Sequence, residues 1–296
     1  MTSPAAIIIN ESSGIGPRRE FVARVLKDSG VEAEIHVTSS GSEISRVAGD
    51  LYRSGHRTLI AGGGDGTIRA VASALVDTEG ILGILPAGGL NHFAKDLKLP
   101  MDLEGCVRIL KKGVVQSVDV AEVNGRMFLN NSGLGLYPAM VARREKRRRL
   151  GQHKWIAMLL ASAATLQRFP FLDVRLTAAG QALKRRTPFV FVGNNAYRME
   201  GINLGSRDSL TEGCLSVGIA QYRIGRWGLV RLAFRALLFG IAGERDLDVL
   251  FADEVQITSR RKRLPVSLDG ELALLEPPLQ YRIRPRALRV IAPEPA

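Results

Sequence analysis

The order of strand-like and helix-like segments is the feature that most restricts the fold of this chain. Up to residue 124, short apolar runs alternate with longer segments of helical period. Strands that are connected by helices build a sheet that is mostly parallel. We therefore expect an α/β domain over residues 1–124. Its predicted strands are 5–10, 31–37, 57–61 and 80–86, and its predicted helices are 19–30, 42–55, 67–76, 91–97 and 103–113.

After residue 124 the pattern changes to short strands that are separated by turn signals. Two helical segments, at about 138–168 and 225–242, interrupt these strands. Closely spaced strands with tight connections pair in antiparallel fashion. We expect residues 125–296 to form a second, β-rich domain of the sandwich type, with no low-complexity linker at the boundary.

The formal net charge of +12 over 296 residues favours a polyanionic partner, which could be a nucleotide, a nucleic acid or an acidic membrane surface. Cys106 and Cys214 fit no disulfide or metal pattern, which is typical of reduced thiols in a cytosolic protein. No signal peptide is evident. The longest apolar helical stretches, 155–166 and 228–243, fall short of the ~18–20 residues that span a bilayer. We expect a cytoplasmic protein, soluble or peripheral to the membrane.

Residues 62–67, Gly-Gly-Gly-Asp-Gly-Thr, lie between a predicted strand and a predicted helix. Glycines let backbone N–H groups turn towards an anion, and the N-terminus of a helix attracts negative charge. The spacing fits neither GxxxxGK[ST] nor GxGxxG, because Arg69 stands where the last glycine would be. Asp65 would repel a bare phosphate unless a divalent cation lay between them. We infer a site for a Mg²⁺-nucleotide; a tight turn without a ligand is the alternative.

Two other polar loops follow predicted strands at the same edge of the sheet, where ligands of parallel sheets collect. Each loop alone fits a helix cap better than a phosphate site, but three loops at one edge favour a common ligand. The residues concerned are Asn10, Ser12, Ser13, Gly14, Gly88, Gly89 and Asn91.

Two carboxylates in strand-like segments have more than one interpretation. Asp119 lies in an apolar run, where it is either functional or a solvated residue of an edge strand. Residues 264–275 predict a hairpin with a type I′ turn at Asp269 and Gly270. The hairpin does not require Glu271, for which an ordinary surface carboxylate is the default interpretation.

Residues 143–155 contain seven basic residues, next to an apolar segment. Such a run forms either a solvated helix face or a patch that binds an anionic membrane. Nucleic-acid binding is less favoured because the run lacks interleaved aromatic residues, and we expect no nucleic-acid partner. No histidine has a metal or triad spacing, and no GxSxG motif suggests a hydrolase.

Taken together, six segments resemble the diacylglycerol kinase catalytic-domain family, which includes bacterial diacylglycerol and lipid kinases and the sphingosine and ceramide kinases. The resemblance covers nearly the whole chain, whereas GGGDGT alone would also fit NAD kinases. The segments are GGGDGT (62–67), LPAGGLNHFAKDLKLP (85–100), VDVAEVNGRMFLNNSGLGL (118–136), FVFVGNN (189–195) and VSLDGEL (266–272), with YRIRPRALRVIAP (281–293) after them.

The resemblance implies a nucleotide domain, a β-sandwich and an active site between them. It implies transfer of the γ-phosphate of ATP to a lipid hydroxyl, with diacylglycerol as the first choice. Asp65 would act through Mg²⁺, Asp119 would support that centre, and Glu271 would be the general base. The residues implied to line the ATP site are Asn10, Glu11, Ser12, Ser13, Gly14, Thr38, Gly63, Gly64, Asp65, Gly66, Thr67, Ile68 and Arg69.

The segment 209–215 resembles a structural metal loop of bacterial members of this family. The resemblance implies that Glu212 would supply a side chain and that Ser209 and Cys214 would supply backbone carbonyls. The family usually has aspartate at the position of Glu212.

Other departures from the family pattern concern the nucleotide loops. Glu11 stands where proline is usual, and Gly89 stands where a threonine would add a hydroxyl to the site. Arg69 replaces a common asparagine, and His92 replaces an aspartate found in many members.

Several alternatives stay open on the sequence alone. The acceptor could be ceramide or a sphingoid base, or a soluble substrate as in NAD kinase. A catalytically weak lipid- or nucleotide-binding module is a further option, because of Gly89 and Glu11. The expected partner is a lipid substrate at an anionic membrane surface. The oligomeric state, including a homodimer, is not determined by the sequence.

Overall fold

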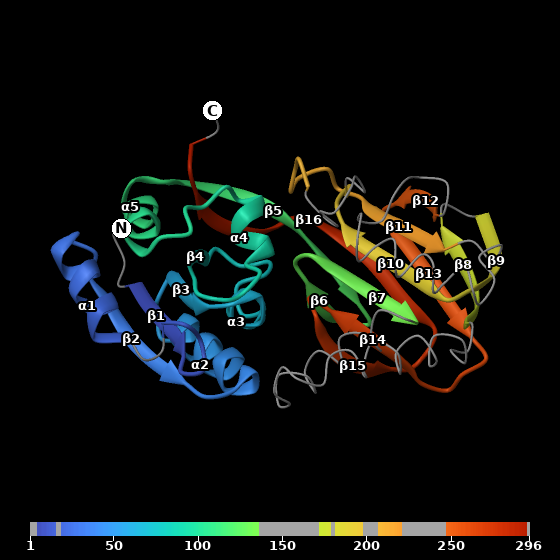
Figure 1. Ribbon diagram of the computed structural model, residues 1–296, viewed down its shortest axis with the longest axis horizontal. Helices are drawn as coiled ribbons and strands as arrows, with labels where there is room; N and C mark the ends of the chain where they lie inside the picture. Colours follow the sequence, from blue (N-terminus) through green and yellow to red (C-terminus); the bar gives the residue numbers. More distant parts are fainter. Residues whose placement is uncertain are drawn as a thin grey trace, which may run out of the picture. The chain divides into compact units, whose positions relative to one another are not determined.

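The computed structural model describes residues 5–15, 19–135, 172–178, 181–197, 207–220 and 247–294. The chain divides into two compact units, shown in Figure 1. One consists of Met1–Val120 and Arg284–Ala296, and the other of Ala121–Ile283. The predicted helical segments at 138–168 and 225–242, and the basic segment 143–155, lie outside the described residues.

The first unit contains a parallel sheet with helices, as the sequence predicts. Its strands run in the order β2-β1-β3-β4, and each neighbouring pair is parallel. The strands are β1 (Ala5–Asn10), β2 (Ala33–Thr38), β3 (Thr58–Gly63) and β4 (Ile81–Pro86). The helices are α1 (Arg19–Asp28), α2 (Gly41–Arg53), α3 (Asp65–Ala72), α4 (His92–Asp96) and α5 (Leu103–Lys112).

The strands β1, β3 and β4 of this sheet are buried on both faces, whereas the edge strand β2 is partly exposed. On one face, Ile7 and Ile9 of β1 share a core with Val22 of α1 and Val107 of α5. The alternate residue Ile8 is also fully buried, and α2 and α3 pack against β1, β3 and each other. A strand that is covered on both faces reads as a continuous apolar run, which is why β1 is so easily found in the sequence.

Strands β5 (Val114–Val123) and β16 (Leu279–Ala292) contribute residues to both units. The C-terminal part of β16 pairs in parallel with β4, with Arg289 opposite Ile81. The end of the chain therefore completes the sheet of the first unit. The division differs from the expected boundary near residue 124, because it falls after Val120 and returns residues 284–296 to the first unit.

The second unit is built from antiparallel strands in two sheets, in agreement with the predicted β-rich domain. One sheet has the order β16-β13-β8-β9, and the other has the order β12-β11-β10-β7-β14-β15. Inward-facing residues of both sheets form one core cluster. The strands not yet defined are β6 (Arg126–Phe128), β7 (Asn131–Gly135), β8 (Leu172–Ala178), β9 (Gln181–Thr187), β10 (Phe189–Asn194), β11 (Leu215–Ala220), β12 (Leu247–Ala252), β13 (Glu254–Ser259), β14 (Leu264–Leu268) and β15 (Glu271–Leu275).

The predicted hairpin between β14 and β15 is present. Leu268 pairs with Glu271, and the two turn residues both have positive φ, 48° at Asp269 and 82° at Gly270. Two positive φ values are the mark of a type I′ turn, so this prediction is confirmed.

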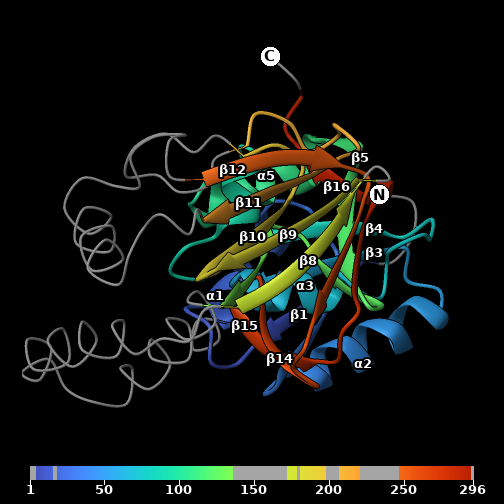
Figure 2. The same ribbon diagram turned by 90° about the vertical axis from the view of Figure 1, so that its right-hand side faces the viewer.

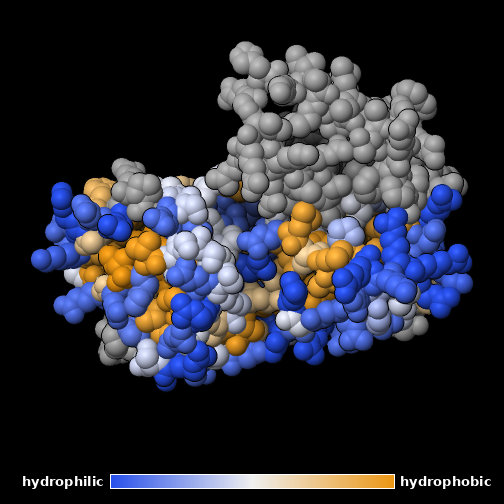
Figure 3. Space-filling model, turned by 90° about the horizontal axis from the view of Figure 1, so that it is seen from below, coloured by the Kyte–Doolittle hydropathy of each residue, from blue (hydrophilic) through white to orange (hydrophobic). Residues whose placement is uncertain are grey.

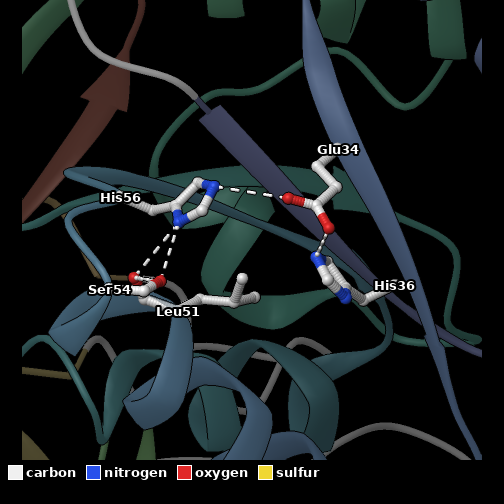
Figure 4. Close-up of polar contacts among 5 residues, drawn as sticks. All are labelled: Glu34, His36, Leu51, Ser54 and His56. Atoms are coloured by element: carbon white, nitrogen blue, oxygen red, sulfur yellow. Dashed lines mark hydrogen bonds and ion pairs between the residues drawn. The ribbon is translucent and has the colours of Figure 1, made fainter.

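A polar cluster joins β2 to the end of α2, as Figure 4 shows. The carboxylate of Glu34 lies 3.1 Å from Nε2 of His36 and 3.5 Å from Nε2 of His56. Nδ1 of His56 lies 3.2 Å from both the hydroxyl of Ser54 and the carbonyl of Leu51. The cluster ties the edge strand of the sheet to the turn that precedes β3.

Among the described residues, no helix combines the length and the apolar character needed to cross a membrane.

Candidate functional site

The loops after β1, β3 and β4 leave the parallel sheet at one edge. The β1–β2 pair ends at Asn10 and Thr38, and the β3–β4 pair ends at Gly63 and Pro86. The backbone N–H of Ala87 then donates to the carbonyl of Gly63 at 2.8 Å. The three loops that the sequence assigned to a common ligand site are thus neighbours in the first unit.

Asn10 organises the loop after β1. Its Oδ1 accepts hydrogen bonds from the backbone N–H of Ser12 at 3.0 Å and from the Ser12 hydroxyl at 2.7 Å. The hydroxyl of Ser13 donates to the carbonyl of Asn10 at 2.6 Å. Asn10 Nδ2 lies 3.4 Å from Oγ1 of Thr67 on α3, and the N–H of Gly14 donates to the loop after β4 at 3.1 Å. The loop after β1 is therefore bound to both of the other loops.

Glycines let the loops after β3 and β4 approach closely. A Cβ on Gly88 would lie 2.6 Å from Cα of Gly64, and a Cβ on Gly63 would lie 2.4 Å from Oγ1 of Thr67. No side chain fits at such distances. The loops therefore expose main-chain groups, and a cradle of backbone N–H groups is the arrangement that suits a phosphate.

Asn91 fixes the loop after β4. Its Oδ1 accepts from the N–H of Gly88 at 2.9 Å, and its Nδ2 donates to the carbonyl of Gly88 at 3.0 Å. Asn91 has a φ of 52°, a conformation that asparagine tolerates better than most residues. A side chain on Gly89 would begin in open space, with nothing within 4 Å. The structure thus places Gly88, Gly89 and Asn91 beside the loop that holds Asp65.

Asp65 is the first residue of α3, and its carboxylate also accepts a hydrogen bond from α4. Oδ1 accepts a hydrogen bond from the backbone N–H of Phe93, in the first turn of α4, at 3.3 Å. Its other oxygen makes no hydrogen bond or ion pair within the part of the chain that the structure describes. A partly exposed carboxylate oxygen of this kind is a suitable ligand for a hard cation, so the residues present fit Mg²⁺.

Three of the predicted nucleotide residues have buried side chains. Thr38 is 3% exposed, Thr67 is 4% exposed, and Ile68 is fully buried. The hydroxyl of Thr38 donates to the carbonyl of Ile9 at 3.2 Å, which fastens β2 to β1. Ile68 packs in the core, so only its main chain could face a ligand. The side chains of these three residues therefore support the loops from within the core of the first unit.

The remaining predicted nucleotide residues are Glu11, Gly66 and Arg69. The side chain of Glu11 is exposed, and its backbone N–H donates to the carbonyl of Thr38 at 2.9 Å. Gly66 and Arg69 are half-buried on α3. Their contacts to a nucleotide stay predictions.

Asp119 is buried on β5, with 1% of its surface exposed, so the interpretation as a solvated edge residue is wrong. Its Oδ1 accepts a hydrogen bond from the backbone N–H of Arg286 at 2.7 Å. Arg286 has a φ of 52° in the middle of β16. The carboxylate thus stabilises an irregular point of that strand, and its support of a metal centre stays a prediction.

Glu271 is the first residue of β15 in the second unit, and its side chain is exposed. On the same turn, Asp269 has a role that the sequence did not reveal. Its carboxylate accepts hydrogen bonds from three consecutive backbone N–H groups, those of Leu129 at 2.8 Å, Asn130 at 2.7 Å and Asn131 at 3.1 Å. Asp269 therefore holds the turn that carries Glu271 against the segment between β6 and β7.

Arg207 binds the same segment by donating hydrogen bonds to its oxygen atoms. It is 6% exposed, and its guanidinium donates to the carbonyls of Leu129 at 2.7 Å and Asn194 at 3.0 Å and to Oδ1 of Asn130 at 2.9 Å. The negative charge of Asp269 binds the N–H groups of residues 129–131, and the positive charge of Arg207 binds oxygen atoms of Leu129 and Asn130. The turn motif explains Asp269 only as a turn residue, and Arg207 belongs to no motif, so only the tertiary structure reveals these hydrogen bonds.

The predicted metal loop is closed by protein hydrogen bonds. The Glu212 carboxylate accepts from the N–H of Ala196 at 2.9 Å, and the Cys214 carbonyl accepts from the N–H of Asn195 at 2.9 Å. Within the described ranges, no group of three or more His, Cys, Asp and Glu side chains could hold a metal. A site formed by Glu212 with the carbonyls of Ser209 and Cys214 stays a prediction, and Glu212 would be its single charged ligand.

Comparison with known protein families gives two separate matches along the chain. Residues 4–123 match the model described as "Diacylglycerol kinase catalytic domain". Residues 134–292 match the model described as "YegS C-terminal NAD kinase beta sandwich-like domain". The two models correspond to the α/β part and the β-rich part of the chain.

Curated relatives agree with these matches. A Pseudomonas aeruginosa protein named "Probable lipid kinase YegS-like" is 29% identical over 274 residues, which cover 90% of this chain and 87% of that protein. A Citrobacter koseri protein of the same name is 34% identical over 140 residues, which cover 45% of this chain and 46% of that protein.

An uncharacterised Synechocystis protein, sll0036, is 27% identical over 278 residues, which cover 90% of this chain and 63% of that protein. The chain thus spans 63% of the length of the Synechocystis protein and 46% of the length of the Citrobacter koseri protein. Among solved structures, a diacylglycerol kinase from Bacillus anthracis matches with a TM-score of 0.72 and 20% identity. The match covers 99% of this chain and 97% of that one, and it shows a shared fold.

Proposed function

Because the chain belongs to the diacylglycerol kinase catalytic-domain family, we propose that it transfers the γ-phosphoryl group of ATP to the hydroxyl group of a lipid. The observation that carries this proposal is the meeting of three loops at one sheet edge, with Asp65 at the start of α3. Diacylglycerol is the first choice of acceptor, and phosphatidic acid would be the product.

The main-chain cradle would bind the phosphates of ATP. Gly63, Gly64 and Gly88 keep side chains away from the place where the loops meet, so backbone N–H groups can approach the phosphate oxygens. Fixed N–H donors stabilise charge without reorganising during the reaction. Asn10 and Asn91 hold the loops in position through the hydrogen bonds described above.

Asp65 would hold a magnesium ion next to the nucleotide. The ion, when bound, neutralises negative charge on the phosphates that are being separated. The hydrogen bond from the Phe93 N–H orients the carboxylate and leaves its second oxygen for the ion. The α3 N-terminus also favours negative charge at this position.

Glu271 would be the general base for the acceptor. The hydroxyl oxygen of the lipid attacks the γ-phosphorus, the bond between this phosphorus and the bridging oxygen of ADP breaks, and the hydroxyl proton passes to the Glu271 carboxylate. Its exposed side chain at the start of β15 is accessible to a substrate. Asp269 positions this turn through its three hydrogen bonds.

A soluble acceptor is the second candidate. It is favoured by the description of the C-terminal family model as NAD kinase-like. In that case the same nucleotide loops would serve, and the phosphate would pass to a dinucleotide instead of a lipid.

A transfer assay with labelled ATP and Mg²⁺ tests these proposals. The acceptors are diacylglycerol, monoacylglycerol, ceramide, sphingosine and phosphatidylglycerol in neutral detergent micelles, and NAD in buffer. We expect label in diacylglycerol first. Label in ceramide or sphingosine alone would move the acceptor to sphingolipids, and label in NAD alone would replace the lipid proposal. If all acceptors stay unlabelled while ATP binds, the chain is a binding module.

A further inference from the structure

A basic groove lies on the outer face of the β13-β8-β9 sheet in the second unit. It has a volume of about 600 Å³. Figure 2 looks onto β8 and β9, which lie in the foreground. Five cationic side chains and one carboxylate line the groove, namely Arg175, Lys184, Arg185, Arg186, Arg260 and Asp173.

The strand period puts Asp173, Arg175, Lys184 and Arg186 on the outer face, whereas Arg185 lies opposite the buried Val174, and Arg260 follows the end of β13. Leu172, Val174 and Leu176 of β8 are buried in the core of the second unit, so the alternate residues Asp173 and Arg175 point away from it. In the register of β8 and β9, Asp173 lies opposite Arg186, and Arg175 lies opposite Lys184.

The pair of Arg175 and Lys184 is unfavourable for the fold by itself. Two like charges directly opposite each other in a sheet repel. Across the other neighbouring strand, Arg175 lies opposite the uncharged Thr258. In contrast, Arg185 lies 3.6 Å from Asp248. Within the described part of the chain, neither Arg175 nor Lys184 nor Arg260 has an acidic partner. Folding does not explain this concentration of positive charge, whereas an anionic ligand would relieve the repulsion.

The positive charge continues beyond the groove. The loop between β13 and β14 reads Arg260, Arg261, Lys262 and Arg263, all exposed. Of these, Arg263 forms an ion pair with Glu276 at 3.0 Å. Figure 3 shows hydrophilic side chains at its right-hand side, where Figure 1 places β8 and β9. The positive area is thus wider than one phosphate group.

We propose that this groove and the loop 260–263, together the basic face, bind the anionic phospholipid surface of a membrane. A bilayer presents many phosphate groups in one plane, which matches a wide array of cations on a sheet. No aromatic side chain lines the groove, although stacking on aromatic rings is a main contribution to binding single-stranded nucleic acid. The inference deepens the proposed function, on which it rests for the presence of the acceptor lipid in such a surface.

Vesicle sedimentation of the full chain tests the basic face. The probes are phosphatidylcholine vesicles with and without phosphatidylglycerol, at low and high NaCl. We expect binding to the anionic vesicles that weakens with salt. Arg175→Gln combined with Lys184→Gln should lower the vesicle partition coefficient by roughly tenfold or more, since each cation near an anionic leaflet adds to the attraction. The same double variant should have an unchanged or higher Tm, because the like-charge pair is gone.

The matched control removes two exposed cations of helices in the first unit, Lys27→Gln combined with Lys112→Gln. It has the same net charge as the groove variant, and its vesicle binding should stay within about twofold of the wild type. Equal losses in the two double variants would mean that net charge alone attracts the membrane, and the proposal would be overturned. It would also be overturned by a groove variant that binds vesicles like the wild type.

Two further measurements separate this inference from others. Binding of a single-stranded DNA oligonucleotide that disappears in the groove variant, with vesicle binding unchanged, would assign the face to nucleic acid instead. In neutral micelles the groove variant should keep the kcat of the wild type. Loss of vesicle binding in the groove variant supports docking even where no acceptor in the transfer assay becomes labelled, so a failure of the proposed function is recognised separately.

Discussion

Asp65 at the start of α3 accepts a hydrogen bond from the backbone N–H of Phe93 at the start of α4, with 3.3 Å between Oδ1 and N. One carboxylate thus joins the loops that follow β3 and β4. The same side chain is the proposed ligand of Mg²⁺. It would therefore both connect the two loops and bind the cation. A substitution that keeps one task and removes the other can separate them.

Asp65→Asn keeps an oxygen that can accept from Phe93 and removes the negative charge. We expect the Tm to stay close to that of the wild type and kcat to fall by about 10²-fold or more, because charge stabilisation in phosphoryl transfer is lost. Asp65→Ala should lower both. The measurement is kcat as a function of Mg²⁺ concentration beside thermal unfolding, and an unchanged Mg²⁺ titration in the Asn variant would contradict the assignment.

Glu271→Gln tests the general base. The side chain is exposed, so we expect the free energy of unfolding and the affinity for ATP to stay unchanged. Removal of a general base lowers kcat by about 10²–10⁴-fold. Glu276→Gln, at another exposed carboxylate after the same strand, is the matched control and should retain kcat. A kcat near that of the wild type in Glu271→Gln would refute the role.

Asp269→Asn tests the hydrogen bonds to residues 129–131. Asparagine tolerates the positive φ of this turn, so the hairpin should persist. One of the two acceptor oxygens becomes a donor and the charge is lost, so we expect the free energy of unfolding to fall by about 2 kcal/mol. Urea unfolding of the two proteins at pH 7 measures this change. Equal unfolding midpoints would show that the three hydrogen bonds contribute little.

Alkaline pH should destabilise the fold through two buried groups. Burial, together with the charge of Asp102, raises the pKa of the Cys106 thiol from 9.0 to about 12. Burial also raises the pKa of Tyr281, against the opposite effect of its hydrogen bond with Ser132. Both groups hold their protons more tightly in the folded state. Their contribution is therefore complete below the unfolded values of 9.0 and 10.0 and is lost as pH rises above them.

The measurement is the urea midpoint from pH 7 to pH 11. We expect it to decline from about pH 9 upwards, and Cys106→Ala should decline less steeply there. A midpoint that is constant through this range would contradict the burial argument.

The sequence predicts most of the first unit because its strands β1, β3 and β4 are covered on both faces and appear as continuous apolar runs. The strand at residues 5–10 coincides with β1, and the helices differ from the predicted ranges by a few residues at their ends. In the second unit, the pattern of short apolar runs does not predict β9. Its exposed Lys184, Arg185 and Arg186 do not look like a strand, and only Leu183 packs against the core. Edge strands often carry such charged residues, so an apolar pattern in the sequence does not reveal them.

The sequence divides the C-terminal residues into two strand-like segments, 279–285 and 287–293, which leaves a break at Arg286. The structure has one strand, β16, in which Arg286 adopts positive φ. The break is bridged by the carboxylate of Asp119, which lies 167 residues earlier in the chain. A local pattern contains no information on such a partner. For the same reason the sequence revealed the glycine loops of the candidate site but not Arg207 or the hydrogen bonds of Asp269.

The pairing of β16 with β4 has a consequence for the order of events during synthesis. When residues 1–120 have left the ribosome, the strands β1 to β4 can assemble, but the outer edge of β4 still lacks the strand that pairs with it in the finished protein. That strand follows Ala121–Ile283 in the chain, so it is translated after the second unit. A nascent chain with an open parallel edge is prone to pair with other chains. Synthesis of the first unit thus begins before that of the second unit and is completed after it.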